Sequence, residues 1–252
     1  MPIQESIIKL NGTMGDLTFY KTEDGFLARR KGGVTAERMR TDPRFERTRE
    51  NQQEFARAGK AVRLIRKVLR SHLLQVADKR MTGRLMQVLN LVVQADKVST
   101  RGQRNVIDGE IELLTGFEFN VNGILTQTFH APYTTVIDRA TGNLSVSIPA
   151  FIPSEMVTYP QGATHCRFFA VGALINFEDG RSVITMSESP EVLKGNQEQA
   201  AIQLAQAVTP ASTDPLLLLL GIRFFQEVNG RFYPLRNGAH NALGVVLVDG
   251  GV

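Results

Sequence analysis

Basic side chains at helical spacing are the residues of this sequence whose types and spacing could do chemistry with a partner. Five of them recur at steps of three and four residues, and we call them the cationic stripe: Arg57, Lys60, Arg63, Lys67 and Arg70. On a helix this spacing places the charges on one side. Such a stripe can neutralise several phosphates of a nucleic acid. Its guanidinium groups can equally pair with carboxylates of another protein, or the stripe can be a solvated helix face.

Three arginines upstream of the cationic stripe, Arg44, Arg47 and Arg49, extend the positive charge toward the N-terminus. The stretch holds few aromatic residues, and we expect Phe45 and Phe55 to be used in packing. Stacking of bases on aromatic side chains is the usual way to bind single-stranded nucleic acid. The eight basic residues are therefore candidate partner-binding residues for a duplex or an acidic protein surface.

The four histidines and the single cysteine form no catalytic pattern in the sequence. His165 and Cys166 are adjacent in a predicted strand, where neighbouring side chains point to opposite faces, so they cannot form a nucleophile and base pair. Cys166 fits better as a small buried side chain, and His72 as a half-buried residue of the basic helix. His130 and His240 fall in predicted turns. A ligand site around His130, His165 and His240 would require these side chains to converge in space.

The acidic and glycine-rich motifs are equally weak. Asp108, Glu110 and Glu112 alternate as they would on one strand face, which suits a cation site but also any exposed polar face. The glycines within 12–15 and 32–33 lack phosphate-binding spacings, and no serine occupies a Gly-x-Ser-x-Gly turn. We therefore predict no catalytic residue, no cofactor and no metal site, and we expect the chain not to be an enzyme.

A helix must position the cationic stripe, and the apolar residues around it predict one. Beginning at Phe55, apolar residues recur at steps of three or four, so residues 48–77 are predicted to form one long basic helix. After a break at 78–83, the same spacing returns in 85–95. This predicts a second helix folded back on the first as a helical hairpin, with one kinked rod as the alternative. Upstream, strand-forming residues around an Asp-Gly turn signal predict a β-hairpin over residues 17–31.

The second half of the sequence is rich in short runs of Val, Ile, Phe and Thr separated by turn residues, which is typical of an antiparallel β-sandwich or barrel. The predicted strands are 116–121, 125–129, 133–138, 143–148, 165–177, 182–187, 200–208, 216–228, 231–235 and 242–248. Residues 197–206 favour a helix equally well.

The polar connector at 99–105 is the predicted domain boundary. We expect an N-terminal hairpin and basic helical module over residues 1–104 and a β-sandwich domain over residues 105–252. The predicted fold class is α+β, with an N-terminal β-hairpin and a long basic helical hairpin followed by an antiparallel β-sandwich.

The charges are unevenly distributed along the chain of 252 residues. The formal net charge is only +4, but residues 28–104 hold 20 Lys+Arg against 7 Asp+Glu, a net of +13. The other residues hold 9 Lys+Arg against 18 Asp+Glu, a net of −9. This division predicts an anionic partner, or another copy of the same protein that presents its acidic part.

The sequence predicts a soluble, cytoplasmic protein. One cysteine excludes a disulfide within the chain and fits a reducing compartment. The first ten residues lack the basic and apolar segments of a signal peptide, so none is expected. The longest apolar run, residues 216–220, is far too short to span a membrane, and no membrane partner is expected.

The first quarter of the chain carries a glycine-rich and basic pattern. It consists of Gly12, Gly15, the run Leu-Thr-Phe-Tyr-Lys at 17–21, Asp24-Gly25, Arg-Lys-Gly-Gly at 30–33, Arg-Thr-Arg-Glu-Asn at 47–51, and Phe55. This pattern resembles the start of a group of uncharacterised proteins from Bacteroidetes bacteria. It is more loosely similar to small phage-like structural proteins that open with a glycine-rich hairpin and a basic linker. The resemblance implies an assembly role and brings no catalytic residue with it.

The expected function is that of a non-enzymatic structural or scaffold protein. We expect it to form homo-oligomers through its long amphipathic helices and through contacts between basic and acidic surfaces. The alternative is a nucleic-acid-binding protein that uses the cationic stripe. A hydrolase or lectin-like site on the loops around the histidines is a third possibility.

Overall fold

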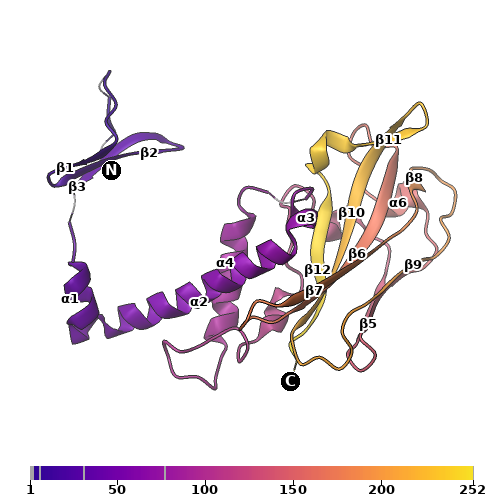
Figure 1. Ribbon diagram of the computed structural model, residues 1–252. Coiled ribbons are helices and arrows are strands. Elements are labelled where there is room, and N and C mark those ends of the chain that lie inside the picture. The colour runs from indigo at the N-terminus through magenta and orange to yellow at the C-terminus, as the bar shows by residue number, and fades with distance from the viewer. Residues whose placement is uncertain (1–2, 6, 31, 77, 252) are drawn as a thin grey trace. The chain divides into compact units, whose positions relative to one another are not determined.

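The computed structural model describes residues 3–5, 7–30, 32–76 and 78–251 (Figure 1). The chain divides into two compact units, Met1–Arg49 and Glu50–Val252, which are described separately below. Both units contain helices and antiparallel strands, so the fold is mixed in α and β structure. In the described part of the chain, no helix combines the length and the apolar character needed to cross a lipid bilayer.

The N-terminal unit is built on a three-stranded antiparallel sheet in the order β1-β2-β3. Its elements are β1 (Gly12–Met14), β2 (Leu17–Thr22), β3 (Gly25–Arg30), α1 (Ala36–Thr41) and the short 3₁₀ helix η1 (Pro43–Phe45). Strands β2 and β3 pair as the Asp-Gly turn signal predicts, and Gly25 has a φ of +121°, which favours glycine. Lys31, the last residue of the predicted hairpin, lies outside the described residues. None of the described residues of this unit is buried.

The long basic helix is α2 (Glu46–Val68), which begins in the first unit and continues into the second. The apolar spacing predicts its buried side correctly from Ala58 through Val62 and Ile65 to Leu69. The prediction for Phe55 is wrong, because its side chain is 58% exposed. The helix is also shorter than predicted, since it ends at Val68 and the short helix α3 (Arg70–Leu73) follows. Ala77, the last residue of the predicted helix, lies outside the described residues.

The second predicted helix is α4 (Met81–Gln94), which buries Leu85, Leu89 and Val92. Helices α2 and α4 cross in Figure 1 and do not run side by side along their lengths, so the predicted helical hairpin is not confirmed. Instead, the buried sides of both helices share one apolar core with a sheet, through residues such as Val171 and Leu219.

That sheet has six strands in the order β11-β10-β6-β7, with β12 also paired to β10 and β8 also paired to β6. The strands are β6 (His165–Ile175), β7 (Ser182–Glu188), β8 (Val192–Leu193), β10 (Leu216–Val228), β11 (Arg231–Pro234) and β12 (Ala242–Asp249). Alternate residues of β10 enter different cores: Leu217 lies in the core shared with the helices, and Leu218 lies in a second core on the opposite face. Burial on both faces explains the continuous apolar run of this strand.

The second core is covered by a three-stranded antiparallel sheet, β4 (Thr134–Asp138), β5 (Asn143–Ile148) and β9 (Ile202–Ala207). Strand β5 alternates as a half-buried strand should, with Leu144, Val146 and Ile148 buried. The two sheets curl toward each other into a half-barrel, because β7 lies close to β9 and β12 lies close to β4. The structure therefore shows curled antiparallel sheets, and the finer prediction of a β-sandwich is not confirmed.

Short helical turns complete the second unit, and they account for the errors in the strand prediction. They are η2 (Ile111–Leu114), α5 (Leu125–Thr128), α6 (Pro153–Met156) and η3 (Leu235–Gly238). The predicted strand at 125–129 is mostly α5, and the one at 116–121 contributes only a single bridge. The helical alternative for residues 197–206 is wrong, because none of these residues is helical and β9 occupies the second half of the segment. The division into compact units falls between residues 49 and 50, and α2 and α4 share a core with the sheet. The domain boundary between residues 104 and 105 stays a prediction.

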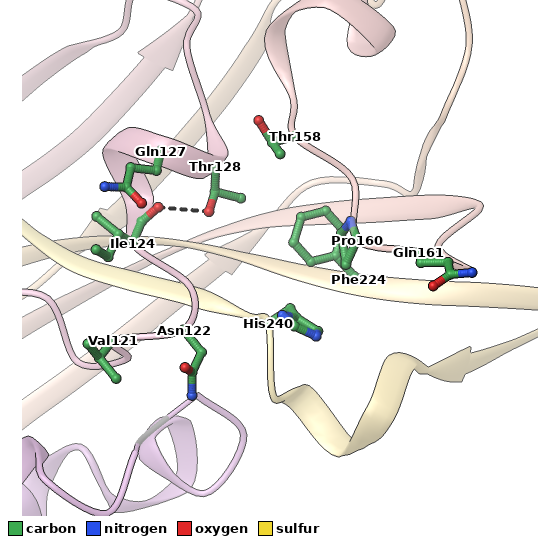
Figure 2. Close-up of a pocket in the computed structure, with 10 residues that line it drawn as sticks. All are labelled: Val121, Asn122, Ile124, Gln127, Thr128, Thr158, Pro160, Gln161, Phe224 and His240. Atoms are coloured by element: carbon green, nitrogen blue, oxygen red, sulfur yellow. Dashed lines mark hydrogen bonds between the residues drawn. The ribbon is translucent and has the colours of Figure 1, made fainter.

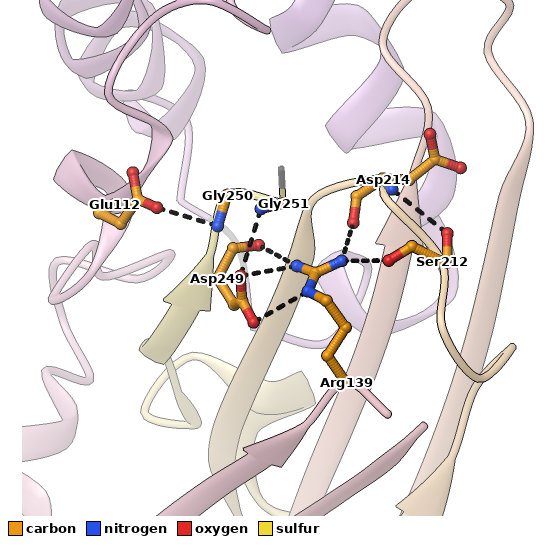
Figure 3. A network of polar contacts seen from close by, with 7 residues as sticks. All are labelled: Glu112, Arg139, Ser212, Asp214, Asp249, Gly250 and Gly251. Atoms are coloured by element: carbon orange, nitrogen blue, oxygen red, sulfur yellow. Dashed lines mark hydrogen bonds and ion pairs between the residues drawn. The ribbon is translucent and has the colours of Figure 1, made fainter. Parts of the chain in front are cut away.

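Arg139, in the turn between β4 and β5, fastens three segments together (Figure 3). Its Nη2 lies 2.7 Å from Oδ1 of Asp249 at the end of β12, and its Nε lies 3.1 Å from the other carboxylate oxygen. Its Nη1 donates to the backbone carbonyls of Ser212 and Asp214 before β10. The Arg139 side chain thus joins the turn between β4 and β5 to the end of β12 and to the segment before β10.

Candidate functional site

Four of the five residues of the cationic stripe are exposed as predicted: Lys60, Arg63, Lys67 and Arg70. Lys60, Arg63 and Lys67 lie on the side of α2 that faces away from its buried residues, which include Ala58 and Val62. Arg70 is the first residue of the short helix α3 that follows. Within the described part of the chain, no ion pair or hydrogen bond occupies these four side chains.

Arg57, the first residue of the stripe, has a different role. Its guanidinium donates to the carbonyls of Gly102 and Arg104 and, at 2.7 Å, to Oε1 of Gln103. The buried carboxylate of Glu54 accepts the Gly102 amide hydrogen at 2.8 Å. These two helix residues hold the polar connector of residues 99–105 against α2, so Arg57 is occupied within the chain.

A further exposed cation was left out of the cationic stripe. Arg66 is exposed, and it lies three residues after Arg63 and four residues before Arg70, so steps of three and four pass through it as well as through Lys67. We call this set the outer cationic face: Lys60, Arg63, Arg66, Lys67 and Arg70. The exposed side of a helix that is buried along one stripe only is wide enough to hold both Arg66 and Lys67.

The three upstream arginines belong to the N-terminal unit. Arg49 is half-buried, and its Nη1 donates to the carbonyls of Met39 and Asp42, each at 2.9 Å. It therefore holds α1 and η1 to the start of α2. Arg44 and Arg47 are exposed.

The histidines do not converge on one site. His165 is buried, with Nδ1 3.0 Å from Oγ1 of Thr164 and Nε2 3.7 Å from Oε2 of Glu227. His130 is exposed, and its Nε2 lies 3.0 Å from Oγ1 of Thr158. His240 and Thr158 line one pocket, which His165 does not reach.

That pocket, of about 310 Å³, is lined mainly by neutral polar side chains (Figure 2). Asn122 and Gln127 reach it from residues 121–128, and Gln161 and His240 reach it from two further segments. Thr128 beside them has its hydroxyl tied to the carbonyl of Ile124 at 2.7 Å. Neither a carboxylate nor a cysteine is among the residues that line this pocket, and its polar side chains offer hydrogen bonds to a neutral polar molecule. The hydroxyl of Thr158 in this lining is the one that lies 3.0 Å from Nε2 of His130.

Cys166 is fully buried, as the sequence indicates. Its sulfur lies 3.3 Å from the hydroxyl of Tyr159, and burial raises the pKa of the thiol to about 12. The thiol is therefore protonated at neutral pH, and a protonated, buried thiol is inert as a nucleophile. His72 is buried as well, and its pKa is lowered first by burial and then by the positive charge of Arg223.

The residues considered for a cation site lie on different structure from that predicted. Asp108 and Glu110 are in turns and Glu112 is in η2, so they do not share one strand face. Glu112 accepts the Gly250 amide hydrogen at 2.9 Å (Figure 3). Among the described residues, no group of three or more His, Cys, Asp or Glu side chains is placed to hold a metal ion.

A pair of arginines is the charged cluster that sequence reasoning missed. Arg167 of β6 and Arg223 of β10 are direct partners in the strand register. Glu188 of β7 bridges them, with its two oxygens 3.1 Å from Arg167 Nη1 and 2.5 Å from Arg223 Nη1. Glu191 pairs with the other end of Arg167. A single arginine inside each of two largely apolar strands is the sequence signal that could have found the pair.

No protein-family model, no curated protein and no solved structure matches this chain.

Proposed function

We propose that the protein is a non-enzymatic structural protein that self-associates, and that its N-terminal unit completes an apolar core against a second copy of the chain. The observation that carries the proposal is the absence of any buried residue among the described residues of the N-terminal unit. Apolar side chains stand open there instead: Ile3 is 65% exposed, Met14 67% and Leu17 45%.

A sheet of this size needs a covering layer. Three short strands are stable only when one face is buried, and each Leu, Ile or Met side chain that becomes fully buried contributes about 1.5–3 kcal/mol. The described N-terminal unit offers no such layer from its own residues. Association therefore has a clear driving force at this sheet.

A second copy is the partner that the charges favour. The outer cationic face belongs to the basic part of the chain, whose net charge is +13. The acidic part has a pocket of about 310 Å³ lined by Asp108, Glu178 and Asp214. A basic surface on one copy and an acidic surface on the next give a head-to-tail contact, which can close into a ring or extend into a filament.

The helical route to association receives no support. The apolar stripes of α2 and α4 are buried against the sheet of the same chain, so they are not available to a partner. The proposed contacts therefore use the N-terminal sheet and the outer cationic face. The cytoplasmic location, the sandwich architecture and the resemblance to Bacteroidetes and phage-like proteins stay predictions.

Light scattering coupled to size-exclusion chromatography of the full chain tests the proposal. We expect a mass above that of one chain at low salt and micromolar concentration, with dissociation as salt is raised. The double variant Met14→Asp with Leu17→Asp should shift the protein to monomer. The matched control, Val136→Asp with Val228→Asp, changes equally exposed valines of the second unit and should leave the mass unchanged.

Two outcomes would contradict self-association. One is a monomer at all concentrations even at low salt. The other is an assembly whose mass is the same in wild type and in the N-terminal double variant, because the N-terminal sheet would then have no part in it.

Nucleic-acid binding is the second candidate, and the outer cationic face is the observation that favours it. Five basic side chains without partners among the described residues could neutralise several phosphates of a duplex. Mobility-shift assays with duplex DNA and RNA test this. Arg63→Glu with Lys67→Glu should abolish a shift, and Lys194→Glu with Arg231→Glu, the same charge change outside the outer cationic face, should not. No shift by the wild type at low salt would exclude this function.

A further inference from the structure

The arginine pair on β6 and β10 stands at the wall of a pocket of about 360 Å³. Arg167 and Arg223 line it together with Phe225, Pro234 and Asn241. All of these residues belong to the second unit. A volume of this size suits a small organic molecule.

Both guanidinium groups are held in fixed orientations. The carbon centre of Arg223 lies 4.1 Å from the ring centre of Phe169, and that of Arg167 lies 5.3 Å from the ring centre of Phe225. Glu188 bridges the two arginines from the neighbouring strand. Stacking and ion pairing together reduce the side-chain entropy that a ligand would otherwise have to remove.

Some N–H donors of the two arginines have no acceptor. Nε of Arg167 and Nε of Arg223 are both buried and have no hydrogen-bond partner. Nη2 of Arg223 contacts the sulfur of Met186 at 4.0 Å, and sulfur is a weak acceptor. A buried donor without an acceptor is costly, so oxygen atoms from a bound molecule would be favourable here.

Two other polar residues line the pocket, Asn241 and Gln75. Oδ1 of Asn241 accepts the Phe224 amide hydrogen at 3.0 Å, and its Nδ2 donates to the backbone carbonyl of Gln75 at 3.1 Å, so the amide of Asn241 is already used. The guanidinium groups are the charged groups left for a ligand, and Gln75 adds a neutral amide to the lining. Phe225 and Pro234 offer an apolar surface beside them.

We propose that this pocket binds the carboxylate of a small organic acid, with Arg167 and Arg223 as donors to its two oxygens and Phe225 and Pro234 against its apolar body. A planar carboxylate matches the planar fork of a guanidinium. Glu188 and Glu191 offset the two arginine charges formally, so the pocket suits a singly charged acid better than a phosphate. This proposal does not depend on self-association.

Titration of the full chain with benzoate, followed by nuclear magnetic resonance, tests the proposal. We expect saturable shifts at the amides of Gly238 and Asn241, which line the pocket. Benzamide has the same shape without the charge, and inorganic phosphate has charge without the apolar body. Both should bind at least about tenfold more weakly than benzoate.

Variants separate the arginine pair from other basic residues. Arg223→Gln should weaken benzoate binding by at least about tenfold, and Arg231→Gln, an exposed arginine on β11, should leave it unchanged. Arg167→Lys keeps the positive charge but removes the planar guanidinium group with its paired N–H donors, so it should also weaken benzoate binding. It serves as the second test if Arg223→Gln fails to fold by circular dichroism.

Three results would overturn the proposal. The first is no saturable binding of benzoate up to about 10 mM, a range that includes weak ligands. The second is binding that shifts amides away from Gly238 and Asn241, or that survives in the folded Arg167→Lys variant with wild-type affinity. The third is tighter binding of phosphate than of benzoate, which would assign the pocket to a different anion.

Discussion

Two three-stranded antiparallel sheets of this protein have the same pairing but opposite burial. In β4-β5-β9, Leu144, Val146 and Ile148 are at most 1% exposed, because the six-stranded sheet covers them. In β1-β2-β3, no described residue is buried. Strand pairing needs only local sequence and a turn, whereas burial needs a second layer. The N-terminal sheet has paired strands, but the described residues of its own unit provide no second layer that would bury one of its faces.

The two sheets do not differ in the residues available for burial. By the register of β2 and β3, Leu17, Phe19 and Phe26 share one face of the N-terminal sheet. Tyr20 and Leu27 share the other face, so both faces carry apolar surface. Nothing in this composition marks the sheet as open. What is missing is a neighbour, so the comparison directs attention to a partner for the N-terminal unit.

A pair of leucine truncations should give the largest contrast between the two sheets. Leu144→Ala empties a site that is 1% exposed and should cost about 2–5 kcal/mol of unfolding free energy. Leu17→Ala, at 45% exposure, should cost within about 0.5 kcal/mol in the monomer. Urea unfolding followed by circular dichroism, at high salt and low protein concentration, measures both.

The same pair of variants can also break the comparison. Equal losses in the two sheets would mean that Leu17 is buried in the monomer. A loss at Leu17 that appears only at high protein concentration would instead sharpen the comparison, since it would show that association supplies the missing layer.

A pair of arginine substitutions should give the next largest contrast. Arg139 joins Asp249, Ser212 and Asp214 through several hydrogen bonds, so Arg139→Ala should cost about 1–3 kcal/mol of unfolding free energy. The ion pair of Arg30 with Asp16 spans 3.8 Å between highly exposed side chains, and Arg30→Ala should have no measurable effect.

Thermal unfolding of the Arg139→Ala and Arg30→Ala variants measures this second contrast. Arg139→Lys is the informative control, because a lysine keeps the charge but cannot make the same set of bonds. If Arg139→Lys were as stable as the wild type, charge alone would explain the contribution of Arg139, and the hydrogen bonds to the two carbonyls would be dispensable.

Local periodicity predicts much of this fold from the sequence. The run at 216–228 coincides with β10, and the helical spacing finds the buried positions of α2 from Ala58 onward. Phe55 breaks the rule, because the connector covers α2 here at Glu54, which is buried and accepts the Gly102 amide hydrogen, and leaves Phe55 58% exposed. The crossing of α2 and α4 cannot be predicted from the sequence. An apolar stripe indicates that a helix is covered on one side, but it does not identify the element that covers it.

Contacts between distant residues explain what the sequence could not predict about the sites. Arg57 fits the cationic stripe by spacing, yet its guanidinium is occupied by Gly102 and Gln103, more than forty residues along the chain. Arg167 and Arg223 become neighbours only through strand register. Spacing reports which residues share an element, but the hydrogen-bond partners that occupy a side chain come from the tertiary fold.

The smallest expected contrast concerns acid sensitivity and separates the two units once more. Burial alone would raise the pKa of Asp78, but hydrogen bonds from the amides of Val121 and Arg80 and from the Arg84 guanidinium outweigh it, so the pKa is lowered. A carboxylate with a depressed pKa stabilises the fold fully above its unfolded pKa of about 3.9, and this contribution is lost as the pH falls through the folded pKa.

Asp78→Asn should therefore lower the free energy of unfolding by about 1 kcal/mol at pH 7. The difference should shrink below about pH 4, because the Asp78 carboxylate of the wild type becomes protonated there and no longer stabilises the fold. Urea unfolding between about pH 2.5 and about pH 7, a range that spans the unfolded pKa of aspartate, gives the unfolding free energy of both proteins against pH. We expect the curves of the wild type and of Asp78→Asn to converge at low pH. Asp16→Asn, at a carboxylate that is 77% exposed in the N-terminal unit, should leave the curve unchanged. Parallel curves for wild type and Asp78→Asn would mean that the hydrogen bonds at Asp78 do not distinguish its charged form, and that the acid sensitivity of the second unit has another source.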